Sequence, residues 1–176
     1  MKKILLSTVA LTAFAFSASA LEAGKMYMKA DANYAFMKIL GAKFKGFGAG
    51  VGIGYALSDD IRGEVNFNFS KPKLKPNSLT TLSLMGDVYY DFNNGSSFTP
   101  YVGAGLGVTH SKLSGIKDKI KDKGHIGLGF NGALGVAYEV AKDVQIDLGY
   151  KLVGNKMKKA DTIFANTVNV GVKFAF

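Results

Sequence analysis

Apolar and polar residues alternate with a period of two along most of the chain after residue 24, a pattern typical of β-strands with one apolar face. The clearest run is Lys45 to Leu57, in which bulky residues from Phe47 onward alternate with glycines at 46, 48, 50, 52 and 54. Runs of this kind cover residues 25–36, 45–57, 61–69, 80–92, 101–108, 125–140, 144–153 and 163–176. Their usual length of about ten residues suits tilted strands that cross a bilayer.

The links between these runs alternate in length. Short links lie at 58–60, 93–97 and 141–143, and longer ones at 37–44, 71–79, 111–124 and 154–162. Outer-membrane barrels have tight periplasmic turns and longer external loops, and an even number of strands places both termini on the periplasmic side. The sequence therefore predicts an all-β fold, an eight-stranded antiparallel up-and-down transmembrane barrel.

The polar faces of these runs carry charged residues that need an explanation. A soluble barrel also has one apolar face, but an eight-stranded interior is just wide enough for side chains to fill, and the bulky face would overfill it. We therefore expect the charges inside, beside the glycines, and paired, because an unpaired buried ion is costly. The expected interior charges form one cluster of Lys29, Asp31, Arg62 and Glu64, a second of Asp147, Lys151 and Lys173, and Asp87.

The first twenty residues have the three parts of a secretory signal. Lys2 and Lys3 precede an apolar run over 4–16, and Ala18 and Ala20 predict cleavage before Leu21. An uncleaved anchor is the alternative, but the apolar core is shorter than the roughly 20 residues that a spanning helix requires. We expect a signal peptide at 1–20 and one barrel domain at 21–176.

The amino-acid composition limits the kinds of site and partner that the protein can have. The 176 residues include no cysteine, which excludes thiolate metal sites and thiol catalysis. The formal net charge is +9, and without Lys2 and Lys3 the remaining 20 basic and 13 acidic residues favour an anionic partner. Nucleic acid is not expected, because no aromatic platform is interleaved with the lysines. The glycine pattern at 127–132 lies within an alternating run and not between a strand and a helix, so it does not predict a dinucleotide site.

The longer links are rich in lysine. We expect these side chains to form a positive outward rim that either neutralises the phosphates of lipopolysaccharide or binds an anionic host surface such as sulfated glycans. The candidate residues are Lys71, Lys73, Lys75, Lys112, Lys117, Lys119, Lys121, Lys123, Lys156, Lys158 and Lys159.

Catalytic and metal chemistry have little support. His110 and His125 are too few for a usual metal site, so no metal or cofactor is expected. His110 with Ser111 would suit a lipid-modifying enzyme, but adjacent strand residues point to opposite faces and no acid is placed to orient the histidine. We assign no catalytic residue and expect no enzyme. A small porin-like channel stays as an alternative function, although eight strands leave little lumen.

Three segments carry a resemblance to a known family. They are the Ala18-Ser19-Ala20 signal, the stretch at 98–105 from Phe98 to Gly105, and the alternating ending at 170–176. Together they resemble the eight-stranded outer-membrane barrels of the OmpA, OmpX and opacity-protein type. The resemblance implies a surface antigen or adhesin in a Gram-negative outer membrane, in contact with lipid and lipopolysaccharide. It also implies that Phe174 and Phe176 are read by the outer-membrane assembly machinery.

Overall fold

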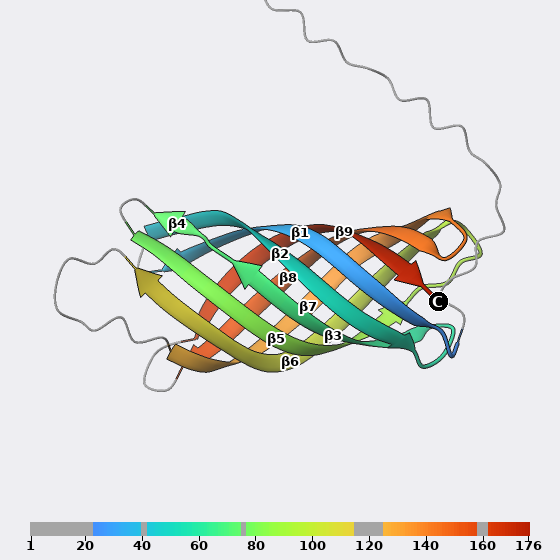
Figure 1. Ribbon diagram of the computed structural model, residues 1–176, viewed down its shortest axis with the longest axis horizontal. Coiled ribbons are helices and arrows are strands. Elements are labelled where there is room, and N and C mark those ends of the chain that lie inside the picture. Colours follow the sequence, from blue (N-terminus) through green and yellow to red (C-terminus); the bar gives the residue numbers. More distant parts are fainter. Residues whose placement is uncertain (1–22, 40–41, 75–76, 115–124, 158–161) are drawn as a thin grey trace, which may run out of the picture.

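Eight long antiparallel strands form a closed sheet (Figure 1). The computed structural model describes residues 23–39, 42–74, 77–114, 125–157 and 162–176. The strands are β1 (Met26–Ile39), β2 (Ala42–Ala56), β3 (Ile61–Ser70), β4 (Lys73–Leu74), β5 (Asn77–Asp91), β6 (Phe98–Ser114), β7 (His125–Ala141), β8 (Val144–Met157) and β9 (Ile163–Ala175). Each long strand pairs with its neighbours in the chain, and β1 also pairs with β9, which closes the barrel. The predicted fold class is confirmed.

The strands are longer than the sequence pattern predicts. β6 and β7 each have 17 residues, more than the 9–11 that cross a bilayer. The longer links at 37–44, 71–79, 111–124 and 154–162 were predicted too wide, because strands extend into all four and β4 lies within the second. Lysines and hydroxyl residues interrupt the apolar alternation there, but backbone pairing continues, for example between Met37 and Phe44. The alternation of side chains marks where hydrocarbon contact ends and not where the strand ends.

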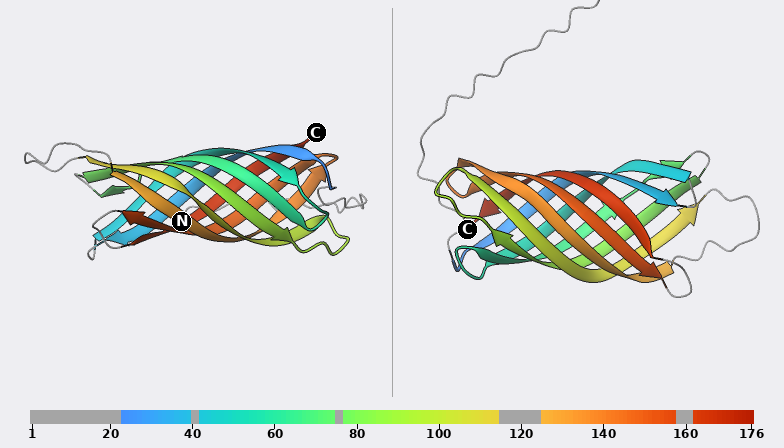
Figure 2. Two further views of the ribbon diagram at one scale, coloured as in Figure 1. Left: turned by 90° about the horizontal axis from the view of Figure 1, so that it is seen from below. Right: turned by 180° about the vertical axis from the view of Figure 1, so that it is seen from behind.

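The two ends of the barrel differ, and we name them for what they carry. The terminal end holds Ala23, Phe176 and the turns at 57–60, 92–97 and 142–143, and the distal end is the opposite one (Figure 2). At the terminal end Asn93 donates a hydrogen bond to the Asp59 carbonyl at 2.6 Å, and Lys25 Nζ lies 2.8 Å from Asp143 Oδ1. Asp143 has a positive φ of 63°, a conformation that aspartate adopts more often than most residues other than glycine. The turns of this end are therefore tied to one another by side chains.

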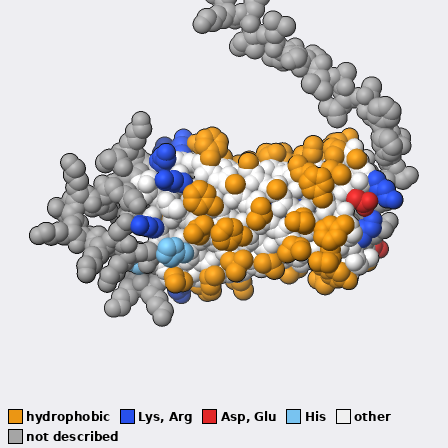
Figure 3. Space-filling model, viewed as in Figure 1, with side chains coloured by type: hydrophobic (Ala, Val, Ile, Leu, Met, Phe, Trp, Pro, Cys, Tyr) orange, Lys and Arg blue, Asp and Glu red, His pale blue; other side chains and the backbone are white. Residues whose placement is uncertain are grey.

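The outer wall is apolar (Figure 3). Phe47 and Ile126 are 76% and 73% exposed, and outward positions on every long strand carry similar residues. Outward charges on the described strands occur only near the two ends. A bulky apolar band of this kind belongs in hydrocarbon, where a closed barrel leaves no backbone group unpaired. The described residues include no helix that is long and apolar enough to cross a membrane.

Candidate functional site

Charged side chains and tyrosines fill the interior toward the terminal end. Arg62 is 2% exposed, and its Nε lies 2.9 Å from Asp91 Oδ2 while its Nη1 donates to Glu64 Oε2 at 3.2 Å. The guanidinium carbon also lies 4.1 Å from the centre of the Tyr89 ring, within the range of a cation–π contact. We call these interior groups the plug: Tyr27, Lys29, Asp31, Arg62, Glu64, Asp87, Tyr89, Asp91, Tyr101, Asp147, Lys151 and Lys173.

Within the plug, one carboxylate lies between two ammonium groups. Lys29 and Lys173 are direct cross-strand partners on β1 and β9, an arrangement that repels. Asp147 is fully buried, with Oδ1 3.4 Å from Lys29 Nζ and Oδ2 2.8 Å from Lys173 Nζ. Tyr101 donates a further hydrogen bond to Asp147 Oδ1 at 3.2 Å. The protein therefore compensates this like-charge pair from within.

A second carboxylate, Asp87, accepts four hydrogen bonds. Oδ2 accepts from Asn66 at 2.8 Å, from Tyr89 at 3.0 Å and from Lys151 at 3.0 Å. Oδ1 accepts from Asn131 at 2.7 Å. These donors come from β3, β5, β7 and β8, so Asp87 links strands on several sides of the lumen.

Glycines on the facing strands make room for the plug. A Cβ at Gly105 of β6 would overlap Asp87 Oδ1, and one at Gly103 would overlap the Tyr89 ring. On β2, a Cβ at Gly54 would overlap the Tyr27 ring. The expectation that glycine rows leave space for long side chains of neighbouring strands is confirmed by these contacts.

The plug differs from the expected two clusters. Lys29 contacts Asp31 and Glu64, each at 3.9 Å, and also Asp147, so it joins the two groups into one network. Lys151 pairs with Asp87 and not with Asp147. Period-two alternation fixes which face a residue occupies, but not which residues meet across the lumen.

Several plug residues were not among the candidates. Asp91 and Tyr89 share a face with Asp87 by alternation, and that signal was available in the sequence. Tyr101 lies on the same face of β6 as Gly103 and Gly105, and its hydroxyl would overlap a Cβ at Gly135 or Gly149. A tyrosine between glycine-rich strands is the pattern that would have found it.

Lys142 is exposed at the terminal end, and the other exposed lysines that the structure describes lie at the distal end (Figure 3). They are Lys43 and Lys45 on β2, Lys71 and Lys73 beside them, Lys112 on β6 and Lys156 on β8. The candidates Lys75, Lys117, Lys119, Lys121, Lys123, Lys158 and Lys159 lie outside the described residues. Lys43 and Lys45 were not among the candidates. Lys43 lies in the predicted link at 37–44 but was not included, and Lys45 was predicted as the start of a strand.

One pair of these lysines stands in direct cross-strand register. Lys45 of β2 is the partner of Lys73 of β4, and both are exposed. Phe47, two residues from Lys45 on the same face, belongs to the apolar band, and the Phe47 carbonyl accepts the Lys71 N–H at 3.1 Å. Among the described residues, every Asp and Glu lies inside the barrel or toward the terminal end, so none compensates this pair.

The histidines and Ser111 do not form a catalytic arrangement. His110 is exposed on the outer wall opposite Ile126, whereas Ser111 is buried and its Oγ lies 3.3 Å from Thr81 Oγ1. The glycine pattern at 127–132 lies within β7. In the described part of the chain no group of three or more His, Cys, Asp or Glu side chains is arranged to hold a metal ion.

The family described as "Outer membrane protein beta-barrel domain" matches residues 6–176. The chain belongs to this family. As a member of the outer-membrane barrel family it is placed in the bacterial outer membrane, where its apolar wall contacts lipid. The lysine-bearing distal end and the plug are therefore features of an outer-membrane barrel.

Two kinds of relatives were found. Outer membrane protein PagN of Salmonella typhimurium is 30% identical over 137 residues, which cover 61% of this chain and 56% of PagN. A 56 kDa type-specific antigen of Orientia tsutsugamushi is 36% identical over 91 residues, 51% of this chain and 17% of the antigen. The chain thus spans little more than half of one relative and less than a fifth of the other.

Solved structures agree on the fold. Neisserial surface protein A is 25% identical with a TM-score of 0.75, covering 86% of this chain and 97% of that protein. Ail, the attachment invasion locus protein of Yersinia pestis, is 15% identical with a TM-score of 0.61, covering 88% and 99%. A second structure of Ail holds the heparin analogue sucrose octasulfate.

Proposed function

We propose that this outer-membrane barrel is a surface protein that binds closely spaced anionic groups through the lysines of its distal end. The observation that carries the proposal is the Lys45–Lys73 pair. Like charges directly opposite in a sheet are destabilising, and an anion that contacts both ammonium groups removes the repulsion. Inside the barrel a protein carboxylate meets this need for Lys29 and Lys173. On the outer wall an external sulfate or phosphate does so for Lys45 and Lys73.

The proposed orientation places the distal end outside the cell and both termini in the periplasm. The turns of the terminal end are short, as periplasmic turns are, and the described surface acids gather there. Phe174 and Phe176, 52% and 65% exposed, stand on the outer wall of that end, where the assembly machinery would read them. The predicted signal peptide at 1–20 is consistent with export to this compartment.

The partner class is an anionic surface polymer or lipid. Ail, a barrel of this fold, has been solved with a heparin analogue, and two of the relatives are a type-specific antigen and an outer membrane protein. Lipopolysaccharide phosphates and sulfated host glycans offer the same chemistry to lysine. The plug occupies the lumen, which argues against the channel alternative, and the separation of His110 from Ser111 gives no support to a lipid-modifying enzyme.

Binding to immobilised heparin and to its desulfated form tests the proposal. The purified protein in detergent is compared with two variants, one for the wall lysines and one for the link lysines. The wall variant replaces Lys43, Lys45, Lys71 and Lys73 by Gln. The link variant replaces Lys112 near the end of β6 and Lys117, Lys119, Lys121 and Lys123 by Gln. We expect the wall variant to lose at least about tenfold in affinity, with a weaker dependence on salt.

Lys142→Gln at the terminal end is the matched control and should bind as the parent does. Equal binding of heparin and desulfated heparin, or parental binding by the wall variant, would contradict the proposal. Vesicles with and without lipopolysaccharide form the second arm. Retention by lipopolysaccharide alone assigns the lysines to the membrane, and retention by heparin assigns them to a host surface.

Orientation has its own test, because the chain lacks cysteine. Lys73→Cys and Lys142→Cys each create a single labelling site at opposite ends of the barrel. A membrane-impermeant maleimide applied to intact cells should label Cys at 73 and leave Cys at 142 unlabelled until the cells are broken. The reverse pattern would overturn the proposed orientation.

A further inference from the structure

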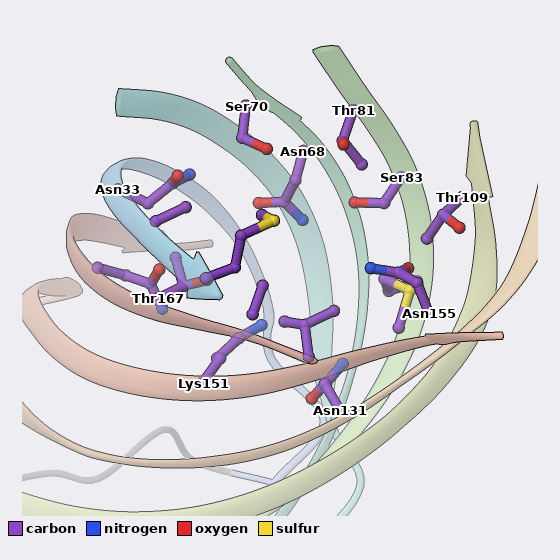
Figure 4. A pocket seen from close by; sticks show the side chains of 16 residues that line it. Asn33, Asn68, Ser70, Thr81, Ser83, Thr109, Asn131, Lys151, Asn155 and Thr167 are labelled. Carbon is purple, nitrogen blue, oxygen red and sulfur yellow. The ribbon is translucent and has the colours of Figure 1, made fainter. Parts of the chain in front are cut away.

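The lumen on the distal side of the plug is small, and its described lining has one charged side chain. A cavity of about 80 Å³ lies there, lined by asparagine, hydroxyl and apolar side chains (Figure 4). The charged residue is Lys151, whose Nζ lies 3.0 Å from the Asp87 carboxylate and is therefore already paired. A phosphorylated sugar is larger than this cavity and would compete with Asp87 for Lys151. The described lysines that an anionic partner can reach at this end lie on the outer wall.

Strand pairing joins lysines of the outer wall through two hydroxyl side chains of β5. Lys45 of β2 is the partner of Lys73 of β4, and Lys73 is in turn the partner of Ser78. Two positions further along β5, Thr80 is the partner of Lys112 on β6. Cross-strand partners share one face of a sheet, so these side chains lie together on the outer wall. We call them the basic tract, which has a lysine pair at one edge, a lysine at the other and hydroxyl groups between.

The length of the apolar spans below the basic tract indicates its level in the membrane. The outward residues of β2 from Phe47 to Tyr55 are apolar or tyrosine, and those of β3 from Ile61 to Phe69 are apolar or glycine. Each span has nine residues, and about 9–11 residues of a tilted strand cross the hydrocarbon of a bilayer. Lys45, the next outward position of β2, therefore lies at the level of the lipid head groups. The anions nearest to the basic tract are those of membrane lipids.

Exposed apolar side chains lie directly below the basic tract on the same face of the sheet. Phe47 follows Lys45 by two positions on β2, and Leu82 follows Thr80 by two positions on β5. Phe69 of β3 is the partner of Leu82. A lipid whose acyl chains lie against these side chains holds its head group at the tract, which raises the effective concentration of its anions there. A soluble polymer has no such anchor.

We infer that the basic tract binds a lipid of the outer leaflet whose head group is a sugar with two phosphates. The inference rests on the proposed function, including the orientation with the distal end outside the cell. One phosphate contacts Lys45 and Lys73, and the second contacts Lys112, two strand intervals or about 10 Å from Lys73. The hydroxyl groups of Ser78 and Thr80 lie between the phosphates, where they exchange hydrogen bonds with the sugar. Phosphate suits the lysines because it presents several charged acceptor oxygens to ammonium donors.

Native mass spectrometry of the purified protein in detergent, titrated with lipid A that carries two phosphates or one, tests the inference. We expect the form with two phosphates to bind at least about tenfold more tightly. Lys112→Gln should remove this preference and leave binding of the form with one phosphate unchanged. Lys45→Gln combined with Lys73→Gln should weaken the binding of both forms. Equal binding of the two forms by the parent, or a preference that persists in Lys112→Gln, overturns the inference.

Two variants serve as controls, and heat-dependent gel migration establishes that each variant is folded. Lys142→Gln at the terminal end should bind both forms as the parent does. Lys45→Arg combined with Lys73→Arg keeps both charges and should bind the form with two phosphates at least as tightly as the parent. Weak binding by this arginine variant would show that charge at the tract is not what holds the phosphate.

Dependence on the acyl chains separates this inference from the proposed function. The phosphorylated sugar without its acyl chains should bind at least about tenfold more weakly than the lipid. Equally tight binding of the two overturns the assignment to a lipid. If the wall variant loses heparin binding while the parent binds the two forms of lipid A equally, this inference fails and the proposed function stands.

Discussion

Lysines stand in direct cross-strand register at three places in the described strands, Lys29–Lys173, Lys45–Lys73 and Lys38–Lys43, and the first two pairs are compensated differently. Lys29 and Lys173 face each other in the interior, with the Asp147 carboxylate between them. Lys45 and Lys73 face each other on the outer wall of the distal end, and no described carboxylate accompanies them. The interior pair needs a carboxylate within the protein, because an uncompensated buried charge destabilises the fold. The outer pair is exposed to water, which weakens the repulsion, and under the proposed function an external anion removes it.

The contrast indicates which lysines serve the fold and which are available to a partner. Interior lysines are fixed by several strands at once and contribute to the closed barrel. Lys45 and Lys73 lie on strands joined by backbone pairing, and their side chains are exposed. Changes to the first group should alter stability, and changes to the second should alter binding.

Removing the interior carboxylate should have the largest effect. Asp147→Asn leaves the buried Lys173 ammonium without its anion and Lys29 with only its longer contacts to Asp31 and Glu64. We expect a loss of about 3–5 kcal/mol in the free energy of unfolding. Urea titration in lipid vesicles, followed by the heat-dependent shift on gels, measures it. The double variant Asp147→Asn with Lys173→Gln restores the charge balance and should recover part of the loss. A single variant as stable as the parent would show that the plug is not electrostatically coupled.

The second largest expected effect concerns the fit between the plug and the glycine rows. Gly105→Ala places a methyl group onto Asp87 Oδ1, and overpacking of this kind costs about 1–3 kcal/mol. Gly132→Ala is the matched control, because its Cβ meets no atom within 4 Å. Equal stability of the two variants in the same unfolding assay would mean that the plug side chains rearrange freely.

Reversing one charge of the outer pair tests whether the exposed lysines Lys45 and Lys73 repel each other. Lys45→Glu turns repulsion with Lys73 into attraction, and we expect a gain of about 0.2–1 kcal/mol in stability together with weaker heparin binding. The pairing of a stability gain with a binding loss is the signature of a lysine kept for a partner. A variant that loses stability would place Lys45 among the structural lysines.

The smallest effect concerns the terminal end. The hydrogen bond from Lys25 lowers the pKa of Asp143, so the folded state holds this carboxylate ionised more readily than the unfolded state. The resulting stabilisation is present above the ordinary carboxyl pKa of about 3.9 and is lost as the pH falls through the lowered value. Asp143→Asn, which tolerates the positive φ, should show a flatter stability profile between pH 5 and pH 3. A profile identical to that of the parent would contradict this account.

The sequence predicts the barrel and its faces because alternation is a local property. Lys29, Arg62, Glu64, Asp87 and Asp147 all lie on the predicted inner face. Partners across the lumen depend on strand tilt and register, which alternation does not contain, and for this reason Lys151 meets Asp87 and not Asp147. The distal strand extensions were missed for a different reason. Outside hydrocarbon, an outward lysine on a strand costs little free energy. The strand can therefore continue where the apolar alternation of its side chains has stopped.

The placement of Lys45 and Lys73 on paired strands determines the distances that a partner encounters. Neighbouring strands lie about 4.8 Å apart, and alternate residues along a strand about 6.6 Å apart. Lys43, Lys45 and Lys73 therefore display positive charge at intervals set by the backbone. Under the proposed function, polymers whose negative groups repeat at a matching spacing are expected to bind more tightly than polymers of equal charge but different spacing.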